Sequence, residues 1–316
     1  MFVSVVTSSY NRATRLPLLY ESLCRQTNQD FEWIIVDDGS TDNTEYVVNT
    51  FFRDGKLLIR YFHKENGGMN TAMNLGIKNA NGLFIFKVDS DDMLLSNAID
   101  RVWFYYNSKY WKTNSKRELS GICFLNQDIN GNIIGDKFKQ DIYISDYITV
   151  RVNEHVSGDK SEVILTEKRK NALYMEFPGE KRYPTSGGLI TLARKYDMLF
   201  VNESIYIRDY LEDGITVSRK KGSVIQTPEG SIHYTNLYLK KDIKYSVRVG
   251  KAIDYIYYCL QVKRGFFSIV FKSNAPLLVF LMFPRSYFGR LYGRWKEKRE
   301  TRKSLLERLN SKCLYR

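Results

Sequence analysis

The sequence predicts an α/β fold with a mostly parallel, doubly wound sheet, followed by a helical extension at the C-terminal end. In the first hundred residues, short β-branched apolar runs alternate with segments of helical spacing, which is typical of repeated βα units. Each apolar run ends in a cluster of polar residues. The last eighty residues are instead basic, aromatic and helical in their spacing.

The elements of the first hundred residues follow from this alternation. Buried strands are predicted at 2–7, 31–36, 56–63 and 83–88, because these runs are apolar and end abruptly in turn-forming residues. Leu16, Leu19 and Leu23 recur at helical spacing and predict the first helix. Further helices are predicted over 44–52 and 70–79 and from about residue 94. Short connections favour parallel pairing.

The pattern after residue 105 is less regular. A hairpin is predicted from 119–125 and 132–134, around the turn Asp128–Gly131. Helices are predicted over 163–172 and 188–193, strands over 222–226 and 232–234, and a long Tyr-rich helix over 242–262.

Composition and targeting signals restrict the class of protein. The 316 residues are 43% hydrophobic and 26% charged, which excludes disordered and fibrous classes. The four cysteines lack the paired spacing of a zinc site or a disulfide scaffold, and the N-terminus lacks the pattern of a signal peptide. We therefore expect a cytoplasmic active domain.

The net charge of +13 is concentrated at the C-terminal end. Residues 240–316 carry 19 Lys and Arg against 5 Asp and Glu, so the rest of the chain is nearly neutral. Two apolar runs in this region, 265–271 and 275–284, are too short to span a bilayer. Basic and apolar residues together predict peripheral contact with an anionic membrane, and they argue against nucleic acid. Packing of these helices on the catalytic domain, or on a second copy in a homo-oligomer, is the alternative.

Three carboxylates follow the fourth predicted strand, at Asp89, Asp91 and Asp92. Carboxylates this close repel one another unless a cation or hydrogen-bond donors share the site. Oxygen ligands suit Mn²⁺ or Mg²⁺, which would bridge the protein and a diphosphate. The alternative is a solvated loop in which Asp92 caps the next helix.

Two other polar clusters end at the same predicted edge of the sheet, where ligands bind in α/β proteins. Asp37–Asp42 offers carboxylates for a base N–H or a ribose hydroxyl, and Gly39 allows a sharp turn. Ser8–Arg12 offers hydroxyls and a ring for a nucleobase. A capping role is the alternative for the Asp37–Asp42 loop.

These motifs, in this order and spacing, resemble those of family 2 glycosyltransferases of the GT-A fold, over roughly residues 1–105. The resemblance implies that Ser8 and Tyr10 line the nucleobase and that Asp38 contacts it. It implies that Glu65–Asn74, with Gly68 and Asn70, passes beneath the diphosphate and ribose. Asp89 would contact the ribose, and Asp91, helped by Asp89, would hold the metal. Arg12 and Ser90 complete the expected contacts with the nucleotide-sugar.

The resemblance also implies an activity and a division of the chain. We expect inverting transfer from a nucleotide-diphosphate sugar, by resemblance a UDP-sugar, to a glycan or lipid-linked acceptor in surface polysaccharide synthesis. Residues 1–105 would bind the donor and 106–240 the acceptor, and 241–316 would form the basic helical region. The chain departs from the family pattern at Thr7–Ser8, where a Pro–Thr pair is usual.

The catalytic base is the least determined part of the predicted site. Ser186 stands near the position where the family has a carboxylate, and a serine cannot accept the acceptor's proton unaided. Nearby candidates are Glu180, Asp159 and the pair Glu212–Asp213, of which Glu180 is narrowly favoured over Asp159. For each one, an ordinary surface ion pair is the alternative.

Two other functions fit part of the pattern. A sugar-phosphate nucleotidyltransferase has a similar sheet, but it should carry a glycine-rich basic loop after the first strand, and Thr7–Arg12 has no glycine. A catalytically inactive, nucleotide-binding scaffold would explain Ser186. Binding of the donor without turnover would distinguish the scaffold from an enzyme.

Overall fold

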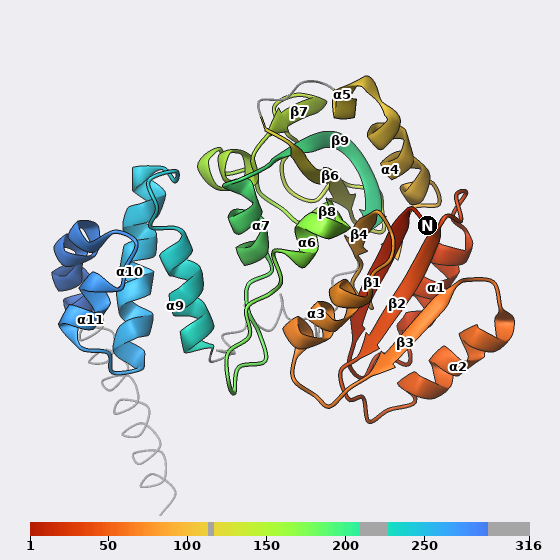
Figure 1. The fold of residues 1–316 in the computed structure, drawn as a ribbon, viewed down its shortest axis with the longest axis horizontal. Coiled ribbons are helices and arrows are strands. Elements are labelled where there is room, and N and C mark those ends of the chain that lie inside the picture. The colour runs from red at the N-terminus through yellow and green to blue at the C-terminus, as the bar shows by residue number, and fades with distance from the viewer. Residues whose placement is uncertain (113–116, 209–226, 290–316) are drawn as a thin grey trace, which may run out of the picture. The chain divides into compact units, whose positions relative to one another are not determined.

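The four strands predicted in the first hundred residues lie side by side in the computed structural model, which describes residues 1–112, 117–208 and 227–289 (Figure 1). Strand β1 is central and pairs in parallel with β2 and β4, and β2 pairs in parallel with β3. All four were predicted within three residues of their bounds, which are Val3–Ser9 (β1), Phe31–Asp37 (β2), Ile59–His63 (β3) and Phe84–Lys87 (β4).

The second half of the sheet is mixed rather than parallel. The strand order is β3-β2-β1-β4-β8-β6-β9-β5, with β7 also paired to β9. Of the pairings beyond β4, only β6 with β9 is parallel. The predicted parallel sheet is therefore confirmed for the first four strands and does not extend further. The added strands are Met93–Leu94 (β5), Leu119–Gln127 (β6), Ile142–Ser145 (β7), Lys160–Leu165 (β8) and Asp197–Ile207 (β9).

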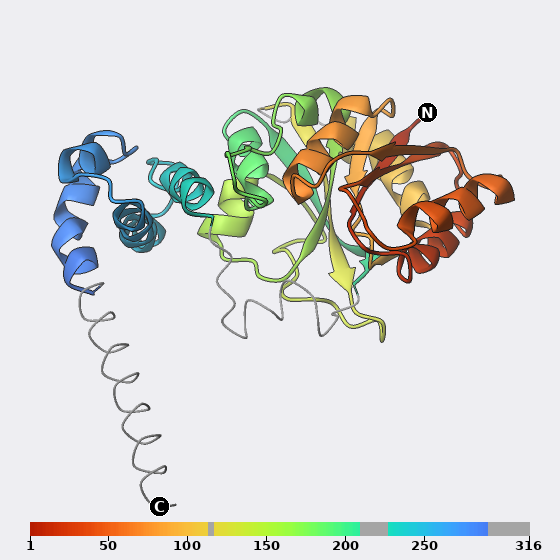
Figure 2. The same ribbon diagram turned by 90° about the horizontal axis from the view of Figure 1, so that it is seen from below.

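Helices cover both faces of this sheet, as predicted (Figures 1 and 2). Trp33 and Ile35 of β2 point to one face, where they share a buried cluster with Leu19 and Phe51. The alternate residues Ile34 and Val36 point to the other face, toward α3. The first face carries Leu16–Cys24 (α1), Thr44–Asp54 (α2) and Ala98–Asn107 (α4). The second carries Met69–Asn79 (α3), Thr166–Lys170 (α6) and Ser186–Ala193 (α7). Two short helical segments, Lys109–Lys112 (α5) and Ile148–Asn153 (η1), complete this part.

Several predictions beyond residue 105 were wrong. Residues 160–165 form a strand, and only 166–170 are helical, because β8 pairs with a strand on each side. Residues 232–234 belong to the helix Pro228–Leu237 (α9), where Ile232 is buried. The predicted turn at 128–131 is present, but its second strand is reduced to one bridge between Gln127 and Ile133. The strand predicted at 222–226 lies outside the described residues.

The long strand β9 is among the elements that the sequence pattern did not predict. It runs for 11 residues, curves strongly (Figure 1), and pairs with β7, β6 and β5 in turn. Its last residues pass Met93 and Leu94, which directly follow the acidic turn Asp89–Asp92. This strand therefore brings Tyr206 and Arg208 to the site described below.

The chain divides into two compact units, Met1–Gly230 and Ser231–Arg316. The described part of the second unit is helical, as predicted, with Tyr245–Gln261 (α10), Phe266–Phe271 (α11) and a helix over 276–289. Its own apolar core includes Leu239, Tyr255, Ile256 and Val279. No helix in the described ranges combines the length and the apolar character needed to cross a membrane.

Candidate active site

The loops after β1, β2 and β3 meet at one edge of the sheet, because these strands are parallel and in register. Ser9 at the end of β1 lies opposite Asp37 at the end of β2, which lies opposite His63. Backbone hydrogen bonds continue past the strand ends: Asp38 N donates to Ser9 O at 2.8 Å, and Lys64 N donates to Asp37 O at 3.0 Å. The convergence predicted from the polar clusters is therefore present.

The first two loops are joined by Asn11. Its backbone N–H donates to Ser40 Oγ at 2.9 Å, and its side-chain oxygen accepts a hydrogen bond of 2.8 Å from Thr41 N. Asn11 has a φ of 52°, a left-handed conformation that Asn tolerates. Its neighbour Tyr10 is 47% exposed, so the ring is accessible for stacking on a base, and Ser8 and Arg12 are half-buried beside it.

Asp38 organises the loop that precedes α3. Its carboxylate accepts hydrogen bonds from Lys64 Nζ at 2.7 Å, from Gly67 N at 2.9 Å and from Gly68 N at 2.7 Å. The side chain is buried, so these charge-assisted bonds are strong. The resemblance assigned Asp38 to the nucleobase. In the structure its carboxylate fixes the loop expected beneath the diphosphate.

The start of α3 contains an unusual buried acceptor. Asn70 is buried, and its Oδ1 atom accepts no hydrogen bond from any residue that the structure describes. The same holds for the hydroxyl of Ser9, at the end of β1. Unsatisfied buried polar atoms are rare, and they are often found where a ligand binds. A ribose hydroxyl is the kind of donor that Asn70 Oδ1 would accept.

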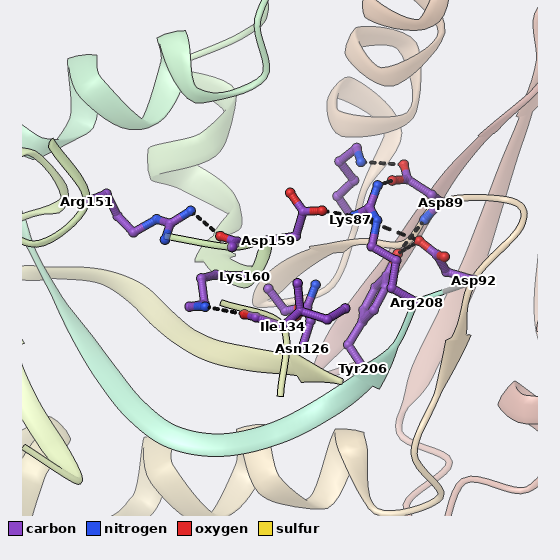
Figure 3. A network of polar contacts seen from close by, with 12 residues as sticks. Lys87, Asp89, Asp92, Asn126, Ile134, Arg151, Asp159, Lys160, Tyr206 and Arg208 are labelled. Atoms are coloured by element: carbon purple, nitrogen blue, oxygen red, sulfur yellow. Dashed lines mark hydrogen bonds and ion pairs between the residues drawn. The ribbon is translucent and has the colours of Figure 1, made fainter. Parts of the chain in front are cut away.

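The acidic turn after β4 is surrounded by cations and by one tyrosine (Figure 3). Asp89 forms ion pairs with Lys87 and with Arg208, whose Nη2 atom lies 3.4 Å from Oδ2. Tyr206 accepts a hydrogen bond of 3.0 Å from Asp89 N and donates one of 2.7 Å to Asp92 Oδ2. Sequence reasoning did not identify Lys87, Tyr206 or Arg208. Only Lys87 gave a signal, as a charged residue at the end of an apolar strand.

The three carboxylates of this turn differ in their electrostatic environment. Burial raises the pKa of Asp89, but the charges of Lys87 and Arg208 outweigh it, so the net pKa is lowered. Burial, and then repulsion by Asp89, raise the pKa of Asp92 to about 7. Burial and Asp89 also raise the pKa of Asp91, and Arg12 opposes this shift. Asp91 is thus a partly buried carboxylate in need of positive charge.

Asp91, with Asp89 beside it, is at most a partial ligand set for a divalent cation, because Asp89 is already paired with Lys87 and Arg208. Among the described residues, no group of three or more His, Cys, Asp or Glu is arranged to hold a metal ion. Mg²⁺, however, is ordinarily held by one or two carboxylates together with the phosphates of a substrate. Among the described residues, no side chain donates a hydrogen bond to Asp91, whereas Asp92 accepts one from Tyr206. The donor set is therefore compatible with a cation that the diphosphate completes.

The structure separates the two favoured candidates for the catalytic base. Glu180 accepts hydrogen bonds from Glu229 N at 2.7 Å and from Gly230 N at 2.8 Å, so both of its oxygens cap the first turn of α9. Asp159 lies 3.3 Å from Arg208 Nε, and its side chain is 46% exposed. Asp159, Asp89 and Ser186 line one cavity of about 410 Å³. The pair Glu212–Asp213 lies outside the described residues.

Residues 4–110 match the family model described as Glycosyl transferase family 2. The glycosyltransferase GlyG of Streptococcus pneumoniae is 29% identical over 71% of this chain and 73% of its own length. A Campylobacter jejuni protein, GalNAc(5)-diNAcBac-PP-undecaprenol beta-1,3-glucosyltransferase, is 25% identical over 89% of this chain and 92% of its own length. A third relative, an uncharacterized glycosyltransferase of Rickettsia felis, is 38% identical, but the match spans only 20% of that protein.

Solved structures share the fold. That of Staphylococcus aureus TarS 1–349 with UDP-GlcNAc has a TM-score of 0.59 and 19% identity, covering 85% of this chain and 77% of that one. GalNAc-T7 with UDP, GalNAc and Mn²⁺ has a TM-score of 0.53 and 14% identity, covering 85% of this chain and 56% of that one. These similarities bear out the predicted GT-A architecture.

Proposed function

The chain is a glycosyltransferase with a family 2 domain at residues 4–110, and we propose that it transfers a sugar from a UDP-sugar to a hydroxyl of a glycan or lipid-linked acceptor. We propose further that the reaction inverts the anomeric carbon and contributes to surface polysaccharide synthesis. The observation that carries the proposal is the anchoring of the Lys64–Gly68 loop by Asp38, at the edge of the sheet where β1 and β2 end.

The donor site follows from this edge of the sheet. The exposed ring of Tyr10, with Ser8 beside it, would stack on the base, and Asn70 Oδ1 would accept a hydrogen bond from a ribose hydroxyl. Arg12, Ser90 and the backbone of Gly68 would contact the rest of the nucleotide-sugar. UDP is the proposed nucleotide, since TarS, which shares the fold, has been described in complex with UDP-GlcNAc.

Asp91, with Asp89, would hold Mn²⁺ or Mg²⁺ against the diphosphate. Bound there, the cation would neutralise negative charge that develops on the leaving diphosphate. The raised pKa of Asp91 supports this role, because a carboxylate in that environment is stabilised by a nearby cation. GalNAc-T7, which has the same fold, is described with Mn²⁺.

Asp159 is the residue that we propose as the catalytic base. Its carboxylate is accessible, lines the cavity beside Asp89, and is oriented by Arg208 at 3.3 Å. In an inverting transfer it would take the proton of the acceptor hydroxyl while the oxygen attacks the anomeric carbon. Glu180 is the weaker candidate, since its carboxylate already accepts two backbone hydrogen bonds.

The second unit carries a surface suited to a lipid-linked acceptor. Between residues 255 and 289 the chain has four basic residues and no acidic one. The same stretch exposes large apolar side chains on α11 and on the helix over 276–289, among them Phe267, Phe271, Leu277, Leu281 and Phe288. We propose that this surface, called here the aromatic surface, binds an anionic membrane. A second copy would bring two positively charged surfaces together, so it is the less favourable partner.

Calorimetric titration of the full chain with UDP and with GDP, each with and without Mn²⁺, tests the donor site. We expect UDP to bind more tightly with Mn²⁺ and the Asp91→Ala variant to lose that gain. Glu21→Ala is the matched control, because Glu21 forms an exposed ion pair with Arg25 at the end of α1. Failure of the folded wild-type chain to bind either nucleotide would contradict the proposal.

A further inference from the structure

The cavity beside Asp89 has an excess of positive charge. It lies within residues 1–230 and measures about 410 Å³, within the usual range for a small-ligand site. Six cationic side chains line it: Lys87, Arg151, Lys160, Arg169, Arg182 and Arg208. Only three carboxylates do so, namely Asp89, Asp159 and Glu162. A cavity for an uncharged sugar would not require this imbalance.

Two of the three carboxylates, Asp89 and Asp159, are paired with fixed cations. Lys87 and Arg208 both pair with Asp89, and Arg208 also pairs with Asp159. Figure 3 shows Asp89 on one side of Asp159, with Arg151 and Lys160 together on the other side. The negative charge at the Asp89 end is thus matched by fixed cations.

The cations at the other end contact mainly neutral carbonyl groups. Lys160 Nζ donates to Ile134 O and Ser157 O, each at 2.9 Å, and Arg151 Nη2 donates to Gly158 O at 2.6 Å. These bonds fix the two side chains but leave their charge in place. Elsewhere in the cavity lining, Arg169 of α6 donates to Ala172 O, and its guanidinium lies 4.4 Å from the ring centroid of Tyr174.

The positive charge at this end is only partly offset by nearby carboxylates. Lys160 is buried, and burial together with the charge of Arg151 lowers its pKa to about 8, although Asp136 and Asp159 act in the opposite direction. Glu162 faces Arg151 and Lys87, but burial raises its own pKa. A bound anion would therefore stabilise the charged form of Lys160.

We propose that the sugar transferred by this enzyme carries a carboxylate, as a uronic acid does, and that Lys160 and Arg151 bind that carboxylate. This inference rests on the proposed donor site, because the donor's sugar must lie beside its diphosphate and hence beside Asp89. The cavity extends from Asp89 to Lys160, so a sugar bound there directs one edge toward the two cations. Charge-assisted hydrogen bonds to a carboxylate are stronger than those to a neutral hydroxymethyl group.

UDP-glucose and UDP-glucuronic acid are matched probes, because they differ only at C6 of the sugar. Calorimetry with Mn²⁺ should give an affinity about tenfold or more higher for UDP-glucuronic acid than for UDP-glucose. Lys160→Gln, which keeps neutral donors for the two carbonyls, should abolish this preference and leave the affinity for UDP unchanged. Lys160→Arg should retain the preference.

Lys170→Gln is the matched control, since Lys170 also donates to a carbonyl, that of Ala80, but does not line the cavity. It should keep the full preference. Equal or weaker binding of UDP-glucuronic acid, in a wild-type chain that binds UDP, would overturn this inference and leave the donor site intact. Absence of UDP binding would overturn both.

Discussion

Gly68 and Asp38 are joined by a hydrogen bond of 2.7 Å from the glycine N–H to the carboxylate, and the geometry of Gly68 makes this contact possible. Gly68 has a φ of +94°, and a Cβ there would collide with the backbone of Lys181. We predict that Gly68→Ala destabilises the fold by more than the roughly 1–2 kcal/mol that a left-handed φ alone costs a non-glycine residue. Thermal or denaturant unfolding measures this loss.

Gly55→Ala is the matched control for that substitution. Gly55 also has a positive φ, +65°, but nothing lies within 4 Å of its Cβ position. Gly55→Ala should lose only the unfolding free energy that the left-handed φ costs an alanine, and it should bind UDP normally. Gly68→Ala should bind UDP weakly if it folds. Equal destabilisation by the two substitutions would show that the contact with Lys181 is unimportant.

Arg208 should contribute more to stability than an ordinary surface arginine. It is the shared cation of Asp89, Asp92 and Asp159, and Arg208→Met would leave partly buried carboxylates without it. We predict a loss of about 3 kcal/mol in the free energy of unfolding. Arg25→Met, which breaks an exposed pair with Glu21, should cost less than about 1 kcal/mol. Similar losses for the two variants would contradict this account.

The first four strands of the fold could be predicted because their signals are local. Each of these strands is a mostly apolar run that ends in a polar turn, so hydrophobic pattern and turn chemistry agree. Residues 160–165 lack that agreement: Lys160 and Glu162 interrupt the run, and the segment is a strand because β4 and β6 pair with it. Long-range pairing of this kind leaves no local pattern.

Residues of the candidate site also divide into those with a local sequence signal and those that depend on tertiary structure. Asp38, Asp89 and Asp91 could be placed after predicted strands from the sequence because their motifs are contiguous. Arg208 could not, since it lies more than a hundred residues from Asp89 and reaches it only through the curvature of β9. Glu180 was favoured as a base for its position in the chain, whereas its hydrogen bonds to the start of α9 depend on tertiary structure.

Asp159 and Glu180 can be separated by conservative substitutions. Asp159→Asn should reduce the rate of sugar transfer by at least about a hundredfold, as expected for loss of a general base, with UDP binding unchanged. Glu180→Gln should keep most of the activity and lose roughly 1 kcal/mol of stability, because a neutral cap replaces a charged one. Transfer assays, with calorimetry for UDP, distinguish the two roles. Loss of transfer in Glu180→Gln alone would reverse the assignment.

We predict that the aromatic surface binds charged lipid vesicles. The chain should sediment with vesicles that contain an anionic lipid and much less with neutral ones, and added salt should weaken the binding. Phe267→Ser with Phe271→Ser removes two side chains that are more than 70% exposed, and it should reduce binding at least about tenfold. Tyr46→Ser with Phe52→Ser, on the exposed side of α2, is the control and should bind normally. Equal binding by both double variants would contradict the proposed surface.

We predict that the free energy of unfolding depends on pH through Lys160. The sign of this dependence follows from the environment of the Lys160 side chain. Burial and Arg151 lower its pKa from 10.5 to about 8 in the folded chain, so the folded state releases this proton first. Between pH 8 and 10.5 the unfolded chain binds more protons, and the contribution of Lys160 to stability therefore rises with pH. The difference in unfolding free energy between wild type and Lys160→Met should shift in favour of wild type by about 2 kcal/mol from pH 7 to pH 10.

Denaturant unfolding of both proteins at each pH measures this shift, and most other titrating groups cancel in the comparison. A difference that stays constant or shifts toward the variant would mean that the folded structure does not lower the pKa of Lys160. The proposed anion site at this end of the cavity would then lose that support.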